Sequence, residues 1–252
     1  MLAEIKGKIS QTGSNLSDRL EDKLTGDFFG TIRYLPFEIG LGPVLSKVRF
    51  RAAECDFLRL IEGLSGYGCR VDFWKSTDYG EPDVLISTEN ADFTIEVKYK
   101  SGLSSDDAVD NSEKKENEES TNQLYRYSKY MLEYSQKQHK YLLLLAPVSI
   151  GVPIFNDMSK CGLIQVSFGL LTWEDVLQAL KEFDDKGFPI WQKMIIGDLV
   201  GLLEKKGFDK FKGFRWGIKT GVTLGSYAYV EESFQWPITI EVRGDLYYEY
   251  RE

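Results

Sequence analysis

Three segments between residues 69 and 99 alternate apolar and polar side chains and are separated by short links. They read CRVDFWKST (69–77), PDVLIST (82–88) and DFTIEVKY (92–99). Alternation with a period of two is typical of strands, and links this short join strands that are antiparallel neighbours. The stretch therefore predicts a three-stranded antiparallel meander, and no other feature constrains the fold as strongly.

Helices and a buried strand are predicted on either side of the meander. Residues 50–64 place apolar side chains at helical spacing, and residues 122–136 do the same. The second helix carries Tyr127, Tyr130 and Tyr134, which we expect to belong partly to the core, with a base-stacking surface as the alternative. KYLLLLAPVSI (140–150) is typical of a fully buried strand. The predicted order is helix, three strands, helix, strand, which is an α/β arrangement.

Composition divides the 252 residues into four segments: an N-terminal arm (1–49), the core (50–150), a helical extension (151–207) and a β-rich C-terminal region (208–252). Within the arm we expect an irregular packed part over residues 26–45, because prolines and glycines interrupt its apolar residues. Within the extension we expect helices over 171–183 and 191–208. Residues 104–121 hold seven acidic residues against two lysines, which predicts a mobile loop.

Several kinds of site are excluded by the residue types present. The single histidine, His139, lies in a polar stretch, and the three cysteines are widely spaced. Histidine-based zinc and iron sites therefore cannot be built, and no glycine-rich phosphate loop follows a predicted strand. No run of apolar residues is long enough to span a membrane and no signal peptide is recognisable, so we expect a cytoplasmic protein. Carboxylate and lysine chemistry remains.

Charged side chains lie inside the predicted meander. Glu96 and Lys98 share one face of their strand, and Asp83 opens the neighbouring strand, where the short turn can bring it level with Glu96. Two close carboxylates repel each other unless a cation lies between them, and Mg²⁺ or Mn²⁺ prefers oxygen ligands. Such a metal polarises a phosphoryl oxygen, and an adjacent lysine can position the attacking water. These residues indicate phosphodiester hydrolysis.

Pro82-Asp83, followed thirteen residues after Asp83 by Glu96-Val97-Lys98, resembles the motif of the PD-(D/E)XK nuclease superfamily. The predicted order of helices and strands over residues 50–150 matches the common core of that superfamily. The resemblance implies a restriction-endonuclease-like fold, with a mixed sheet flanked by helices. Additional C-terminal helices and a small β-rich region would follow this core.

The resemblance extends to three further positions. Gln123 and Tyr127 are similar to the QxxxY element of the branch that includes RecB-like nucleases. Glu54 stands on the first core helix, where the family often places another metal-assisting acid, with Glu38 and Glu62 as alternatives for that role. Tyr127 would help to orient the substrate, although it is more often a packing residue.

The function implied by the resemblance is that of a Mg²⁺-dependent or Mn²⁺-dependent DNA endonuclease. Asp83 and Glu96 would hold the metal, with Glu54 completing its shell. Lys98 would assist the attacking water or neutralise developing charge, and Gln123 would orient the site. Restriction, phage defence, repair and transposon end-cleavage all stay open. Cutting both strands of a duplex would imply a homodimer.

The net charge of −8 is unfavourable for a nucleic-acid partner, although much of it is concentrated in residues 104–121 and 231–252. One alternative is therefore a non-catalytic protein of the same fold that binds nucleic acid or a protein partner, as in a multi-component system. Another alternative is a structural or regulatory protein whose working surface is the β-rich region 208–252.

Overall fold

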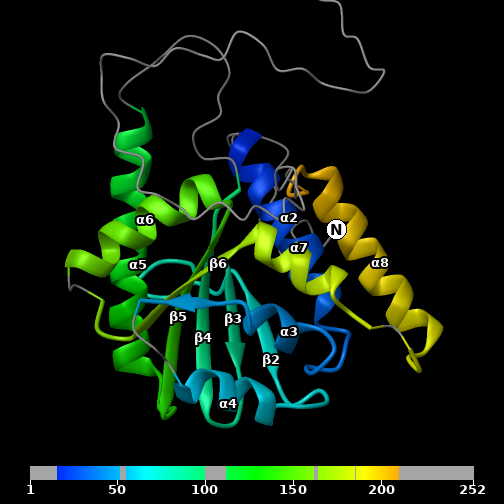
Figure 1. Ribbon diagram of the computed structural model, residues 1–252. Coiled ribbons are helices and arrows are strands. Elements are labelled where there is room, and N and C mark those ends of the chain that lie inside the picture. The colour runs from blue at the N-terminus through cyan, green and yellow to red at the C-terminus, as the bar shows by residue number, and fades with distance from the viewer. Residues whose placement is uncertain (1–15, 52–54, 100–111, 162–163, 185, 210–252) are drawn as a thin grey trace, which may run out of the picture. The chain divides into compact units, whose positions relative to one another are not determined.

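The computed structural model describes residues 16–51, 55–99, 112–161, 164–184 and 186–209. The chain separates into two compact units, Met1–Phe211 and Lys212–Glu252. The second unit lies outside the described residues, and so does nearly all of the region 208–252 that is expected to be β-rich. The described part of the first unit is an α/β fold built on one six-stranded mixed sheet flanked by helices (Figure 1).

The predicted meander is present as β2 (Arg70–Phe73), β3 (Val84–Ser87) and β4 (Ala91–Val97). Both neighbouring pairs are antiparallel, as expected from the short links. Val84 lies opposite Ile95 in the register, so one further step places Asp83 opposite Glu96. The site residues of the motif are therefore brought level by the hairpin itself.

The rest of the sheet continues from β4 through parallel neighbours. β5 (His139–Ala146) pairs with β4, and β6 (Ser167–Thr172) pairs with β5. β1 (Arg49–Phe50) is antiparallel to β6 at the edge. The predicted strand over 140–150 is too long, because the strand ends before Pro147, which lacks the N–H that a ladder needs. The extension expected to be helical over 151–207 in fact supplies β6.

One face of the sheet is covered by α5 (Ser112–Tyr134) and α6 (Val148–Cys161). Their buried side chains pack on β5, and the cluster includes Leu124, Met131, Leu142, Leu144 and Ile154. α5 begins ten residues earlier than predicted, so part of the acidic segment 104–121 is helical rather than a mobile loop. The physical reason is that glutamate and lysine are good helix formers, which can extend a helix anchored by its apolar half.

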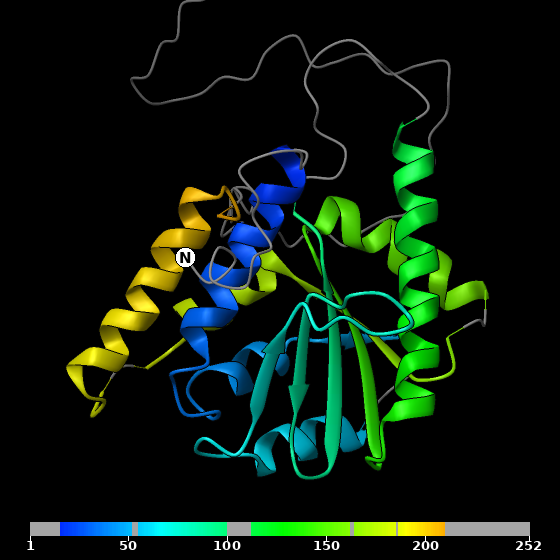
Figure 2. The ribbon, with the colours of Figure 1, turned by 180° about the vertical axis from the view of Figure 1, so that it is seen from behind.

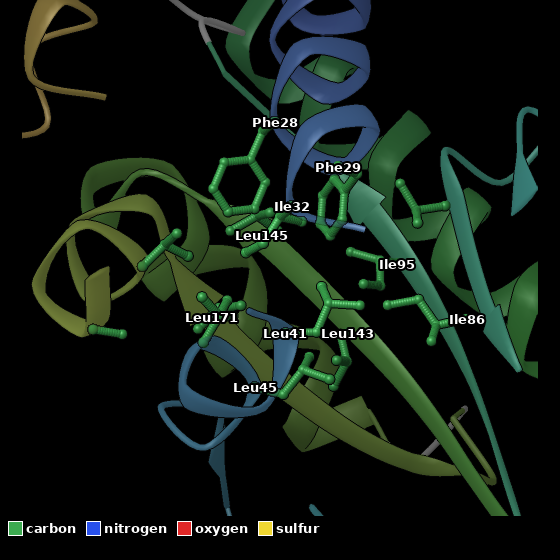
Figure 3. Packing of buried hydrophobic residues seen from close by; sticks show 14 of the residues in the cluster. Phe28, Phe29, Ile32, Leu41, Leu45, Ile86, Ile95, Leu143, Leu145 and Leu171 are labelled. Atoms are coloured by element: carbon green, nitrogen blue, oxygen red, sulfur yellow. The ribbon is translucent and has the colours of Figure 1, made fainter. Parts of the chain in front are cut away.

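The other face carries a larger aromatic core (Figure 3). It is formed with α2 (Leu16–Ile32), α3 (Leu41–Leu45), α4 (Cys55–Gly63), α7 (Trp173–Lys181) and α8 (Ile190–Lys205). Figure 3 shows Phe28, Phe29 and Ile32 of α2 above the sheet residues Ile95 and Leu145. The helix predicted over 171–183 is present as α7, and Thr172 caps it by accepting from the Asp175 amide at 3.1 Å.

The expectation of an irregular arm over residues 26–45 is wrong for its first part. α2 is continuous from Leu16 to Ile32 and buries Leu24, Phe28 and Ile32, which recur every four residues. Gly26 and Gly30 obscure this pattern in the sequence, since glycine disfavours a helix interior. Tertiary burial of the apolar stripe outweighs that preference.

Several strand ends lie together at one edge of the sheet, which is where a functional site can form. β4, β5 and β6 are parallel and end there, and the antiparallel β3 begins there. α6 and α7 follow directly from β5 and β6 at the same edge. Ligands of open α/β sheets commonly bind outside the carboxyl ends of parallel strands. Among the described helices, none is both long and apolar enough to cross a membrane.

Candidate functional site

Asp83 is held at the carboxyl edge by the strand that it faces. Its Oδ2 accepts a hydrogen bond from the Val97 amide at 2.8 Å, and only 8% of the residue is exposed. Asp83 stands immediately before β3, which begins at Val84, so its side chain rather than a strand carbonyl accepts from the last amide of β4. This anchors the carboxylate by one oxygen, and within the described part of the chain Oδ1 has no hydrogen-bond partner.

Glu96 and Lys98 lie on β4 and on the residues that follow it, on the same face as Asp83. Lys98 Nζ is 2.8 Å from Glu96 Oε1, and the two side chains are 13% and 3% exposed. The main chain of Lys98 is fixed on both sides. Its amide donates to the Leu145 carbonyl at 2.7 Å, and its carbonyl accepts from Trp173 Nε1 at 3.0 Å. The ammonium is therefore presented by a rigid segment.

Glu21 is a site residue that the sequence analysis missed. It comes from the first turns of α2, and its Oε1 lies 3.6 Å from Lys98 Nζ while its Oε2 accepts from the Tyr99 amide at 2.8 Å. The signal that could have found it is its spacing. Glu21 stands three and seven residues before Leu24 and Phe28, so it shares the buried side of the helix.

Glu96 and Glu21 thus pair with one ammonium, and Asp83 lies near enough to act on its charge. Burial raises the pKa of Glu21 to about 7, although Lys98 opposes this. Burial, with the nearby Glu96 and Glu21 carboxylates, raises the pKa of Asp83 well above its ordinary value. Desolvation lowers the pKa of Lys98, but the three carboxylates outweigh it and the net pKa is raised. Lys98 is therefore the charged cation, and the acids compete for it.

Tyr127 of α5 lies beside this cluster. It is 1% exposed, its ring would contact a Cβ placed on Gly80, and burial followed by the Glu96 and Asp83 carboxylates raises the pKa of its hydroxyl. Gln123 lies one helical turn earlier on α5 and is half-buried. No hydrogen bond of the described residues joins Gln123 to the carboxylates, so the structure brings Tyr127 to the site more clearly than Gln123.

The acids expected on or near the first core helix do not join the cluster where they are described. Glu54 lies outside the described residues. Glu38 accepts from the Gly66 amide at 2.7 Å, which serves the turn after α4, and Glu62 is exposed on α4. Phe57 of α4 packs on Phe93 and Tyr141, near the start of β4 and β5. The described part of α4 therefore lies toward the end of the sheet opposite the site.

The donor set suits a hard divalent cation by its chemistry, because buried carboxylates with raised pKa gain most from an added positive charge. Within the described ranges, however, no three acidic, histidine or cysteine side chains are already arranged as metal ligands. Lys98 Nζ lies between Glu96 and Glu21 instead, which holds these two carboxylates apart from a shared ion. Metal binding here would require the lysine contacts to rearrange.

Comparisons with protein-family models, with curated proteins and with solved structures found no match. What the site can do must therefore be argued from its own geometry and charge. A buried, rigidly held ammonium among three carboxylates, at the carboxyl edge of parallel strands, is an arrangement suited to stabilising charge during a reaction.

Proposed function

We propose that this protein is a divalent-metal-dependent nuclease that hydrolyses phosphodiester bonds of DNA. The observation that carries the proposal is the buried group of Asp83, Glu96, Lys98 and Glu21 at one edge of the sheet. Burying three acids with one base is costly for stability, and folded proteins keep such arrangements at sites that use them. Asp83, Glu96 and Lys98, which form the motif in the sequence, lie near one another in the folded chain.

The proposal includes a restriction-endonuclease-like fold of the PD-(D/E)XK type. It is supported by the order of the elements, with α4 before the meander β2–β3–β4 and with α5 and β5 after it. The parallel pairing of β5 with β4 agrees with the mixed sheet that the resemblance implies. α2 adds a departure from the expected segmentation, since it supplies an acid from residues expected to form only an arm.

Each residue of the group has a proposed part in the reaction. Asp83 and Glu96 would hold Mg²⁺ or Mn²⁺, with Glu21 in the assisting position that the sequence analysis gave to Glu54. The ion, when bound, supplies Lewis-acid polarisation of the phosphoryl oxygen and a more acidic water. Lys98 would hold the attacking water by a hydrogen bond or neutralise the charge that develops on the phosphoryl oxygens. Tyr127 would pack beside the charged group, and Gln123 would orient the DNA backbone over that group.

A second candidate is a non-catalytic protein of the same fold that binds nucleic acid or a protein partner. It is favoured by one observation, that Lys98 closes the carboxylates into ion pairs and the described residues show no preformed metal ligand set. In that case the group would be a structural ion cluster. It would neither bind Mn²⁺ nor need all four residues for partner binding.

Cleavage of supercoiled plasmid and of single-stranded DNA in Mg²⁺, in Mn²⁺ and in EDTA separates the two candidates. The chains compared are the wild type, Asp83→Asn, Lys98→Met and Glu62→Gln. Glu62→Gln is the matched control, because it removes an exposed carboxylate from α4. We expect metal-dependent cleavage by the wild type and by the control, and loss of cleavage in the other two.

Mn²⁺ calorimetry on the same four chains completes the test. Heat of binding that disappears in Asp83→Asn would support the metal role of that carboxylate. Neither cleavage nor Mn²⁺ heat in the wild type would favour the non-catalytic candidate. Cleavage that survives Asp83→Asn would place the reaction at another site and would overturn the assignment of residues.

A further inference from the structure

A pocket of about 190 Å³ lies between α5 and the sheet face that carries Glu96. Its floor is formed by β2, β3 and β4, and its wall is the second half of α5. Charged and aromatic side chains at its lining include Arg70, Asp72, Lys75, Asp92, Tyr130 and Tyr134. Thr94 precedes Glu96 by two residues on the same strand face, which places the pocket floor roughly 7 Å from the carboxylate group along β4.

The loop between β2 and β3 reaches toward α5 (Figure 2). Tyr79 Oη donates to a Glu133 carboxylate oxygen, and Tyr134 Oη donates to Asp78 at 3.3 Å. These bonds tie Asp78 and Tyr79 of the loop to the last turn of α5. The same loop contributes Lys75 to the pocket lining and runs on into Pro82 and Asp83, so one loop connects the pocket with a proposed metal ligand.

Aromatic rings line the helix side of the pocket. Tyr130 and Tyr134 stack with their centroids 5.5 Å apart and their planes at 27°, and Tyr134 is 51% exposed. Tyr134 also meets the Tyr79 ring edge to face, with centroids 6.3 Å apart, and the exposed part of its ring can take a further flat ring. Tyr134 therefore differs from Tyr127, which is fully buried, although the two belong to one stripe of the helix.

The floor of the pocket offers hydrogen-bonding groups of both kinds. Asp92 is held in place by Ser87 Oγ and Ser135 Oγ, each at 2.6 Å. Arg70 Nε is paired with Asp72 at 2.9 Å, and Lys75 adds a second cation at the lining. Two cations against two acids give a charge close to balance, which favours a neutral polar ligand over a phosphate or a free carboxylate.

We propose that this pocket receives one unpaired nucleobase of the strand whose phosphodiester bond lies at Asp83 and Glu96. The inference rests on the proposed function, which it deepens by assigning the substrate as single-stranded or locally unpaired DNA. A nucleobase is flat, neutral and edged with donors and acceptors, which matches an aromatic wall above a polar floor. Base stacking on tyrosine tolerates every base, so the pocket selects an unpaired state rather than a sequence.

Single-stranded oligonucleotides that carry one fluorescent 2-aminopurine test the pocket without cleavage. They are titrated in EDTA against the full chain carrying Asp83→Asn, alone or with Tyr134→Ala, Tyr134→Phe or Tyr67→Ala. Tyr67 is 64% exposed on the turn after α4 and serves as the matched control. We expect Tyr134→Ala to weaken binding by about tenfold and to remove the quenching that stacking causes. Tyr134→Phe and Tyr67→Ala should retain both.

The outcomes separate this inference from the proposed function. Unchanged affinity and quenching in Tyr134→Ala would overturn the base pocket while leaving the nuclease proposal intact, provided that the wild type cleaves DNA in Mg²⁺. Stacking that depends on Tyr134, combined with a wild type that does not cleave DNA in Mg²⁺ or Mn²⁺, would overturn the nuclease proposal and keep the pocket. Equal binding of a fully paired duplex, again without quenching, would show that the pocket does not take a base.

Discussion

Two ion pairs in this protein have similar distances between their charged atoms but very different surroundings. Lys98 and Glu96 lie 2.8 Å apart with side chains that are 13% and 3% exposed. Lys47 and Glu182, which join the segment after α3 to the end of α7, lie 2.6 Å apart, and their side chains are 35% and 51% exposed. The two pairs have nearly the same distance between their charges, but they differ in how far water reaches their side chains.

The difference teaches what each pair does for the molecule. The charges of an exposed pair interact with water about as favourably as with each other, so the pair contributes little to the free energy of unfolding. A buried pair has lost its water, and removing one partner leaves a charge with nothing to solvate it. At the site three carboxylates share a single ammonium, so this region is held in a state that further positive charge would relieve.

The largest expected effect comes from removing the buried ammonium. Lys98→Met leaves Glu96, Glu21 and Asp83 without a cation, and we expect the free energy of unfolding at pH 8 to fall by about 3–5 kcal/mol. Urea denaturation of this variant beside Lys47→Met measures the contrast. A loss of equal size in the two variants would show that burial is not what distinguishes the pairs.

The second effect is a dependence of stability on pH. Between pH 4.5 and about 7 the unfolded chain releases the Glu21 proton and the folded chain keeps it, because the folded pKa is the higher one. The unfolded state then binds fewer protons, so the free energy of unfolding falls as pH rises through this window, by up to about 3 kcal/mol from this group. Asp83 acts in the same direction.

Denaturation of the wild type and of Glu21→Gln at pH 5 and pH 8 checks this expectation. The variant should lose less stability over the interval, since its side chain does not titrate. Glu182→Gln, from the exposed pair, should keep the slope of the wild type. A slope that is the same in all three chains would contradict the role given to Glu21.

The third effect concerns added metal. If Mn²⁺ binds at the carboxylates, it stabilises the folded state by about 2.7 kcal/mol when its free concentration is a hundred times its dissociation constant. The gain should be larger at pH 8 than at pH 5, because protons compete for the same oxygens. Thermal unfolding with and without Mn²⁺ measures it, and Asp83→Asn is expected to show no gain. A gain retained in that variant would place the ion elsewhere.

The smallest effect belongs to the exposed pair. Lys47→Met should lower the free energy of unfolding by less than about 1 kcal/mol, and even this should vanish in 1 M NaCl because salt screens exposed charges. The cost of Lys98→Met should persist in the same salt. Urea denaturation of both variants at low and high salt therefore sharpens the comparison by a second, independent variable.

Much of the meander could be predicted because its information is local. The alternation in 69–99 sets which side chains face each way, and the short turns set the register. β6 escaped prediction since its short apolar run becomes a strand only by pairing in parallel with β5, which is distant in the chain. α2 was not predicted because Gly26 and Gly30 disfavour a helix in isolation, whereas burial of its apolar stripe in the core stabilises it.

The sequence by itself indicated that Asp83, Glu96 and Lys98 can meet, because one hairpin carries all three and alternation along the strand puts Glu96 and Lys98 on one face. Only the tertiary structure decided that Glu21 joins them, since this depends on where α2 packs on the sheet. The tertiary structure also decided how far the pKa values of Glu21 and Asp83 are raised. A pKa responds to desolvation and to charges a few ångströms away, and both are set by the elements that cover the site rather than by the residues next in the chain.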